Sequence, residues 1–566
     1  MRPGLRSIRL LGTMSTLRHS PPPSEAPAAK QPRREHGVAP RPRSEKLERK
    51  RLHNLRKNYE RGVAKNGEPP ILHDIREMIG AGRVAQILTN GTEFDRVSPM
   101  NEEVSVTIER LSSHGDGLAL SPYGDRVIAV PFALPGETVR VYPYGSERLY
   151  LKARVVERLS SSPMRRDDLV ACRYFGTCGG CQYQMIPYEQ QLELKQLVVL
   201  NAYKHYAGLD ESLLPDVLPT MGSPATMGYR TKLTPHFDLP SAIRKGTAGD
   251  DFPPVPIGFD SVATGRVMDI EECPIGTPAI NAALPRERQS VRDRIKSYKN
   301  GATLLLRDSL RDFDASDSVV VTDHKATVHE VVGKSRFSSP AGAFFQNNRS
   351  IIPLVIEYIE AQDLFSKDTP QYLVDTYCGS GLFAISLAPR FQEVAGVEIS
   401  AASIECAKKN AEINGIKNAK FLAGNAENIF ASISYPPEHT TVVIDPPRRG
   451  CDEEFIKQLV ALRPAHIVYV SCNVHTQARD VGMIVRASPS YRVHSIRGFD
   501  FFPQTQCVTA NQSRRGHLCA RKYGVLEPDE AREAASDQRT PSDAEPGPRH
   551  PERNVCKLHH HSGYQA

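Results

Sequence analysis

The feature that most constrains the fold is an alternation of short apolar runs with helical patterns between residues 346 and 509. Four of these runs lie at residues 372–376, 394–397, 442–444 and 467–470. Such an alternation predicts a doubly wound α/β sheet whose strands are mostly parallel. Ligands of these sheets bind at the carboxyl ends of the strands, so the residues that follow each run are the first candidates for a site.

A glycine-rich turn follows the first run. The run ends at Asp375, and the turn contains Gly379 and Gly381 before a helical pattern begins. Small residues there let the backbone approach a ligand closely. Glu398 comes nineteen residues after Gly379, at the end of the next run, where a carboxylate can accept hydrogen bonds from both ribose hydroxyls. The pattern indicates a nucleotide or S-adenosylmethionine site, and the missing GxGxxG argues against a dinucleotide. An ordinary turn beside a solvated Glu is the alternative.

Two further segments lie where cofactor and acceptor are expected to meet. Asn425-Ala426-Glu427 follows the run at 420–422, where an adenine is expected to lie. Asp445-Pro446-Pro447-Arg448 follows the run at 442–444, the place where Rossmann-type methyltransferases bring cofactor and acceptor together. Because some amino-methylating enzymes also carry an acidic DPPR, this motif indicates the class of enzyme and not the substrate.

Cys472 is the candidate nucleophile. It comes directly after the run at 467–470, on the ligand side of the predicted sheet. Carbon 5 of uracil is a poor nucleophile, but a thiolate that adds to carbon 6 makes an enolate whose carbon 5 can attack a methyl group on sulfonium. A base must then remove the proton from carbon 5, and the thiolate leaves. A buried structural cysteine is the alternative.

Taken in order, these motifs resemble the RNA 5-methyluridine methyltransferase family. The motifs are DTYCGSG at 375–381, GVE at 396–398, DPPRRG at 445–450 and VSCN at 470–473, and Phe344-Phe345-Gln346-Asn347 also fits. The likeness runs from about Met100 to Cys507 and is closest to the fungal tRNA (uracil-54-C5)-methyltransferase branch. The resemblance implies that Cys472 attacks carbon 6 and that five residues contact S-adenosylmethionine, namely Gln346, Tyr377, Glu398, Asn425 and Asp445. The family usually has Pro where this chain has Val474.

Residues 98–158 predict a small β-barrel. Val104, Val106 and Ile108 alternate with polar residues, and turn signals separate this run from the apolar run at 127–130. The segment looks like a TRAM domain, an OB-like module that binds RNA. Any small barrel would show the same alternation.

The eleven cysteines are better suited to a metal site and to catalysis than to disulfides, because their number is odd and no secretory signal is present. Cys172, Cys178 and Cys181 form a Cx5CxxC cluster, and Cys273, which precedes a proline, is a fourth candidate. Four thiolates can hold a zinc ion or a [4Fe–4S] cluster. The resemblance implies the [4Fe–4S] cluster, and reduced, unliganded thiols are the alternative.

The charge of the chain is concentrated at its N-terminus. Residues 1–60 hold 15 Lys or Arg and five acids, a net charge of +10. Because the net charge of the whole chain is +7, residues 61–566 carry about −3. RNA binding by the folded part therefore needs local patches, and residues 229–232 (Tyr-Arg-Thr-Lys) are either an RNA-contact strand or an exposed basic edge strand. The first 20 residues resemble a mitochondrial transit peptide or a basic arm.

The likeness breaks after residue 505. Residues 502–505 (Phe-Pro-Gln-Thr) match the family, but Cys507 stands where the family has His and Thr509 where it has the Glu that removes the carbon-5 proton. Loss of a general base typically costs about 10²–10⁴-fold in rate. Nothing that resembles a strand is expected after Ala510, so the sequence predicts a missing sheet strand, and a C-terminus misassembled near codon 507 is one explanation.

The sequence therefore predicts an α/β Rossmann-like methyltransferase domain with an N-terminal small β-barrel and a mixed α+β central domain. We expect an intracellular monomer that binds RNA, most readily tRNA, in cytoplasm, nucleus or mitochondrion, with no DNA or membrane partner. The alternatives are an RNA-binding protein with an inactive methyltransferase domain and an rRNA 5-methyluridine methyltransferase. The predicted divisions are a mostly disordered basic arm at 1–97, the TRAM barrel at 98–158, the central domain at 159–345, the methyltransferase domain at 346–510 and a disordered tail at 511–566.

Overall fold

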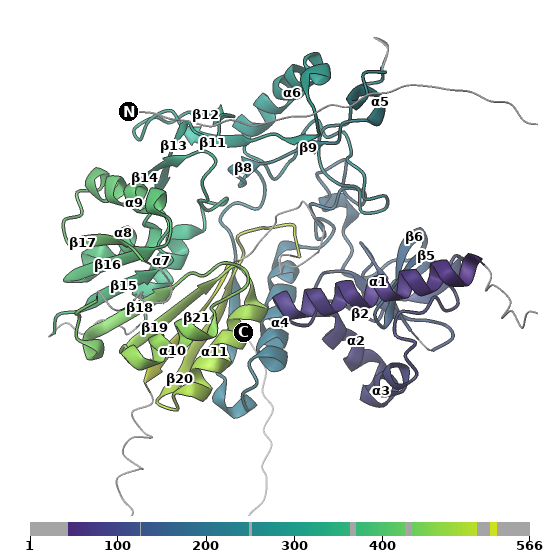
Figure 1. The fold of residues 1–566 in the computed structure, drawn as a ribbon, viewed down its shortest axis with the longest axis horizontal. Helices are drawn as coiled ribbons and strands as arrows, with labels where there is room; N and C mark the ends of the chain where they lie inside the picture. Colours follow the sequence, from purple (N-terminus) through teal and green to yellow (C-terminus); the bar gives the residue numbers. More distant parts are fainter. Residues whose placement is uncertain are drawn as a thin grey trace, which may run out of the picture. The chain divides into compact units, whose positions relative to one another are not determined.

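A computed structural model of the 566-residue chain defines its fold (Figure 1). The structure describes residues 43–124, 126–247, 252–362, 369–424, 430, 433–506 and 521–528. Residues 1–53 and 54–566 form separate compact units, and the fold and site discussed here belong to the second. In the described ranges, no helix combines the length and apolar character needed to cross a bilayer.

The second unit is built around an eight-stranded sheet with the order β17-β16-β15-β18-β19-β21-β20-β7. Its strands are β7 (Val217–Met221), β15 (Tyr372–Thr376), β16 (Glu393–Glu398), β17 (Ala419–Ala423), β18 (Thr440–Ile444), β19 (His466–Ser471), β20 (Tyr491–Phe499) and β21 (Arg521–Pro528). The five strands from β15 to β19 are parallel, and β21 runs antiparallel to both of its neighbours. The predicted doubly wound α/β fold is confirmed.

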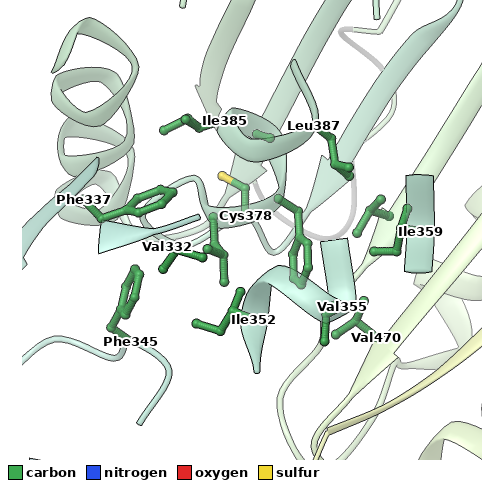
Figure 2. Packing of buried hydrophobic residues seen from close by; sticks show 14 of the residues in the cluster. Val332, Phe337, Phe345, Ile352, Val355, Ile359, Cys378, Ile385, Leu387 and Val470 are labelled. Carbon is green, nitrogen blue, oxygen red and sulfur yellow. The ribbon is translucent and has the colours of Figure 1, made fainter. Parts of the chain in front are cut away.

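Alternate residues of each central strand pack against helices on opposite faces of this sheet. Leu373 and Val443 join a cluster with α7, α8 and α9, while Val374 and Val442 join a second cluster with α4, α10 and α11. Figure 2 shows the first cluster, where Val355 of α7 and Cys378 lie among the labelled apolar side chains. The helices are α4 (Tyr188–Tyr206), α7 (Ile352–Glu360), α8 (Leu382–Leu387), α9 (Ala401–Ile413), α10 (Glu453–Leu462) and α11 (Val474–Ala487).

The prediction that no strand follows residue 510 is wrong. β21 lies between β19 and β20 and pairs with both along its length, from Lys522 opposite Ser471 to Leu526 opposite Ile467 on the β19 side. Without it, the facing edges of β19 and β20 would leave buried backbone N–H and C=O groups without partners, which is costly. The sheet is therefore complete, although it is closed by a segment with no resemblance to the family's usual ending.

A six-stranded sheet with the order β1-β5-β6-β4-β3-β2 forms the predicted small barrel. The inward-facing residues of its strands, including Val106, Val139 and Leu151, form a separate apolar cluster. The alternation seen in the sequence is therefore the alternation of burial along the strands. The strands are β1 (Val104–Thr107), β2 (Arg110–Leu111), β3 (Gly117–Leu120), β4 (Val127–Val130), β5 (Thr138–Glu147) and β6 (Tyr150–Ser160).

The prediction that residues 1–97 are mostly disordered is wrong for residues 43–97. Three helices occur there, α1 (Arg43–Asn66), α2 (Ile71–Ile79) and α3 (Ala81–Thr89). Leu72 and Ile75 of α2 are buried in one cluster with Leu118 and Val127 of the barrel. Each such burial contributes about 1.5–3 kcal/mol. The polar composition of residues 43–97 suggested disorder. The few apolar residues of α2 are nevertheless buried, because they pack on the barrel, which comes later in the sequence.

The central domain carries a second sheet with the order β12-β11-β13-β14, and β8 pairs with β11. Two elements of the central domain pack with the methyltransferase domain. Strand β7 pairs with β20 and extends the large sheet, and α4 packs on α11. The remaining elements are β8 (Lys232–Leu233), β9 (His236–Phe237), α5 (Ser241–Arg244), α6 (Pro278–Asp293), β10 (Ala302–Thr303), β11 (Leu306–Leu310), β12 (Ser318–Val321), β13 (Thr327–Val332) and β14 (Ser335–Pro340).

Candidate active site

The predicted site residues follow a single row of paired strand residues. Val397, Thr376, Ile444 and Tyr469 are successive Cα partners across β16, β15, β18 and β19. The residues directly after the first three are Glu398, Tyr377 and Asp445, and Cys472 lies three positions beyond Tyr469. Adjacent strands are about 4.8 Å apart. The parallel register therefore brings these four residues to one edge of the sheet, which we call the carboxyl edge.

The Glu398 carboxylate is fixed by backbone donors. It accepts hydrogen bonds from the N–H of Gly379 (3.3 Å) and the N–H of Ser400 (3.0 Å). Gly379 has φ of +55°, and the space where a Cβ would lie is open. An acid held beside an open, left-handed glycine turn fits a ribose, because the carboxylate is oriented and the backbone leaves room for the ligand.

Close packing shapes the rest of the glycine-rich turn. A Cβ on Gly381, whose φ is +88°, would lie 2.8 Å from Ile385 Cδ1. Tyr377 has φ of +60°, a conformation that costs of order 1–3 kcal/mol in a residue other than glycine. Its ring packs on Phe455 with 5.3 Å between centroids. Strain at this point of the chain is typical of a ligand-binding turn.

The other two residues expected at the cofactor are Gln346 and Asn425. Gln346 is buried, and residues beside it in the chain are fixed by their contacts, since Phe345 joins the apolar cluster and the Asn348 side chain donates to the carbonyl of Phe501 (3.1 Å). Asn425 lies outside the described residues. The preceding residue, Gly424, donates its N–H to the carbonyl of Glu398 (3.1 Å), so the chain enters this segment beside the acid.

Cys472 lies between β19 and the first turn of α11 and is half-buried. The next residue, Asn473, caps α11 by accepting from the N–H of His475 (3.1 Å), and its amide donates to the carbonyl of Arg448 (3.0 Å). Thr476 donates to the same carbonyl (3.1 Å). The nucleophile's turn is thus tied to the DPPRRG segment that follows β18.

A buried carboxylate, Asp480 of α11, fixes the same two segments. It accepts from the N–H of Cys451 (2.7 Å) and from the hydroxyl of Tyr469 (2.6 Å). Burial raises the pKa of Asp480, although the charge of Arg479 opposes the shift. Sequence reasoning missed this residue. The available signal was an acid on the face of α11 that otherwise carries Ala478, Val481 and other buried apolar residues.

The Phe-Pro-Gln-Thr segment is held from the central domain. The carbonyl of Gln504 accepts from the N–H groups of Gln182 and Tyr183 (both 3.0 Å), and Gln191 exchanges two hydrogen bonds with Gln504. Lys195 of α4 forms a buried ion pair with Asp500 (2.6 Å). These contacts fix the chain up to Gln506. Cys507 and Thr509, the substituted positions, lie outside the described residues.

The four cysteines of the predicted cluster are gathered in the central domain as free thiols. Each of the six pairs that they form interacts electrostatically, and burial followed by these interactions raises the pKa of Cys273 to about 11 despite the opposing charge of Arg230. Among the described residues, no group of three or more His, Cys, Asp or Glu side chains is arranged to hold a metal ion. The interactions show only that the four thiols are neighbours.

Comparison with known proteins identifies two segments. The family described as tRNA (Uracil-5-)-methyltransferase matches residues 315–511, and the TRAM domain family matches residues 100–156. The first match contains the carboxyl edge, and the second covers the six-stranded barrel except for the end of β6. The helices α1 to α3 precede both matches.

Two fungal relatives and one solved structure are similar over most of the chain. The tRNA (uracil(54)-C(5))-methyltransferase of Schizosaccharomyces pombe is 47% identical over 414 residues, which cover 72% of this chain and 77% of that protein. The enzyme of the same description from Saccharomyces cerevisiae is 39% identical, with 72% of each chain covered. The crystal structure of Pyrococcus abyssi tRNA (uracil-54, C5)-methyltransferase in complex with S-adenosyl-L-homocysteine has a TM-score of 0.52 at 23% identity and covers 75% of this chain and 99% of that one, which supports the fold.

Proposed function

Because the chain belongs to the tRNA (uracil-5-)-methyltransferase family, we propose that it transfers a methyl group from S-adenosylmethionine to carbon 5 of uridine 54 in tRNA. The observation that carries the proposal is the row of Glu398, Tyr377, Asp445 and Cys472 at the carboxyl edge. It supports a cofactor and a nucleophile at one place, which this reaction requires. The fungal relatives are named for this substrate position.

We assign the cofactor to the half of the edge around Glu398 and Gly379. The carboxylate, already oriented by two backbone N–H groups, accepts hydrogen bonds from the ribose hydroxyls. Ile399, which is 75% exposed beside Glu398, offers an apolar surface for the adenine. S-adenosylmethionine supplies the methyl group when it is bound there.

Cys472 begins the reaction as a thiolate. Its sulfur forms a bond to carbon 6 of the uracil, and the electron pair of the C5–C6 double bond moves onto carbon 5 and O4. The electron pair on carbon 5 then forms the bond to the methyl group, the bond between the methyl group and sulfur breaks with its electrons left on sulfur, and S-adenosylhomocysteine is the leaving group. A base removes the proton from carbon 5, the double bond re-forms, and the sulfur leaves carbon 6. The ties from Asn473 and Thr476 to Arg448 keep the thiol beside the acceptor segment throughout.

One position favours a second function. Thr509 stands where the family has its proton-abstracting Glu, and a hydroxyl is not a base near neutral pH. A protein that binds tRNA and forms the Cys472 adduct but releases it slowly would fit that substitution. This alternative predicts binding with little turnover.

We also propose that Cys172, Cys178, Cys181 and Cys273 hold a [4Fe–4S] cluster. The proximity of the four thiols supports it, because a [4Fe–4S] cluster is held by four cysteine thiolates. The role would be structural, since methyl transfer needs no electron. Iron and acid-labile sulfide in protein purified without oxygen would support the cluster, and zinc in their place would contradict it.

The test of the proposed function uses purified full-length protein, S-adenosylmethionine and unmodified tRNA transcript. We expect 5-methyluridine in the digested product, at uridine 54, and none after substitution of that uridine by cytidine. Ribosomal RNA serves as the competing substrate. Methylation of rRNA alone would overturn the tRNA assignment, and tRNA binding without any product would favour the second function.

A further inference from the structure

A strand of the central domain presents an unusual group of cations. Arg230 and Lys232 lie two residues apart in extended chain, so they share a face, and Lys232 is the direct Cα partner of Arg307 on β11. Like charges directly opposite each other in an antiparallel pair destabilise a sheet. The free protein therefore carries a local cost at this position.

The nearby carboxylates neutralise other residues. Glu330 forms a buried ion pair with Arg307, and Asp308 pairs with Arg349 (3.3 Å). Among the described residues, no carboxylate lies within ion-pair distance of Lys232, which is half-buried. Burial, and then the charges of Arg307 and Arg230, lower the pKa of Lys232. The Lys232 ammonium group thus lies near two guanidinium groups, of which Glu330 neutralises that of Arg307.

The same strand contacts two segments that carry motifs of the family, residues 344–347 and 502–505. The N–H of Thr231 donates to the carbonyl of Asn347 (2.9 Å), next to Gln346. The hydroxyl of Tyr229 donates to the carbonyl of Pro503 (3.0 Å), and the Arg230 guanidinium lies over the Phe502 ring at 5.3 Å. An anion held by Lys232 would therefore lie near the two segments that carry the Phe-Phe-Gln-Asn and Phe-Pro-Gln-Thr motifs.

The charge balance of the chain favours RNA as the source of that anion. Residues 61–566 carry about −3, so a folded core that binds RNA needs local positive patches. Phosphodiester groups are the anions that flank any uridine in RNA, and Lys is a common phosphate ligand. The cofactor's carboxylate is the competing anion, and the two make different kinetic predictions.

We propose that Lys232, with Arg230 and Arg307 beside it, binds a backbone phosphate of the RNA next to the target uridine. The inference rests on the proposed function for the identity of the RNA. It assigns to the β8 strand the positioning of the substrate backbone, while Cys472 reacts with the base. A like-charge cluster that costs stability in the free protein becomes favourable when the phosphate arrives.

The test replaces Lys232 by Gln in the full-length protein and measures binding of the tRNA transcript at several salt concentrations. We expect affinity to fall about tenfold, which corresponds to one charge-assisted contact. The slope of log K against log salt should fall by about one phosphate contact. The KM for S-adenosylmethionine should stay unchanged. Lys232→Arg should retain the affinity, and Lys325→Gln, which removes an exposed charge from the same domain, should change neither quantity.

Thermal unfolding without RNA gives an independent reading. Because Lys232→Gln removes a like-charge repulsion, its Tm should equal or exceed that of the wild type. A lower Tm, or wild-type tRNA affinity and salt slope, would overturn the proposal. A raised KM for S-adenosylmethionine with unchanged tRNA affinity would also overturn it by assigning the anion to the cofactor. If the protein bound tRNA but transferred no methyl group, the proposed function would fail while the phosphate contact was still measured.

Discussion

The two halves of the carboxyl edge are stabilised by contacts of different range. In the cofactor half, around β15 and β16, Glu398 accepts from Ser400, two residues away, and from Gly379 in the neighbouring turn. In the acceptor half, Asn473 and Asp480 tie the loops after β18 and β19 to each other, and the segment after β20 depends on buried side chains from distant parts of the chain. Lys195 and Asp500, for example, are 305 residues apart. Damage to the cofactor half should therefore stay local, whereas damage to the acceptor half should reach the whole fold.

The largest effect is expected for Lys195→Met. The substitution leaves the Asp500 carboxylate buried without its cation, which typically costs about 3–5 kcal/mol. Chemical denaturation should show this loss. Lys457→Met is the matched control, because Lys457 forms an exposed pair with Glu454 in the same domain and should change stability by less than about 1 kcal/mol. Equal effects of the two substitutions would remove the contrast between the halves.

A smaller loss is expected for Asp480→Asn. The amide keeps the shape of the side chain but loses charge-assisted hydrogen bonds from Tyr469 and Cys451, worth about 1.5–3 kcal/mol. Because both partners lie beside the acceptor segments, kcat should fall while the KM for S-adenosylmethionine stays within about twofold. Tyr469→Phe removes one of the two bonds and should show about half of the loss in stability. A change in the KM alone would contradict the assignment of Asp480 to the acceptor half.

In the cofactor half, alanine substitutions at two glycines of one turn should have different effects on stability and on cofactor binding. Gly381→Ala combines a left-handed backbone with a Cβ 2.8 Å from Ile385, and should cost about 1–2 kcal/mol of stability or more. Gly379→Ala has the same backbone cost, but its Cβ enters open space. We expect this second variant to raise the KM for S-adenosylmethionine more than its stability loss explains. Unchanged cofactor binding would argue that the ligand does not approach Gly379.

The smallest effect is a change in the pH dependence of unfolding. Burial raises the pKa of Asp480 in the folded protein. Its contribution to stability is therefore fully present below the pKa of an unfolded aspartate, about 3.9, and is lost as pH rises through the raised value. Asp480→Asn should flatten this decline in the free energy of unfolding above pH of about 4. An unchanged slope would mean that the carboxyl titrates normally.

The same difference in range explains what the sequence could reveal. The turn at Gly379 follows β15, Glu398 is the last residue of β16 and Cys472 directly follows β19, so local patterns located them. The role of Lys195 depends on a partner far along the chain and left no local pattern, whereas the local signal for Asp480 was an acid on the apolar face of α11. The burial of α2 on the barrel was missed because the apolar residues it covers lie elsewhere in the sequence. Strand β21 was missed because its position between β19 and β20 depends on strand pairing and not on its composition.

The central claim is that Cys472 attacks carbon 6 of the uridine. The most direct test uses tRNA in which 5-fluorouridine replaces uridine, because fluorine cannot leave as a proton and the covalent adduct persists. With S-adenosylmethionine, the wild-type protein should form a protein–RNA complex that survives denaturation, and Cys472→Ala should form none. This result does not depend on the residue at position 509, since the trapped step precedes proton removal. An adduct of equal yield from Cys472→Ala, or none from the wild type, would contradict the claim.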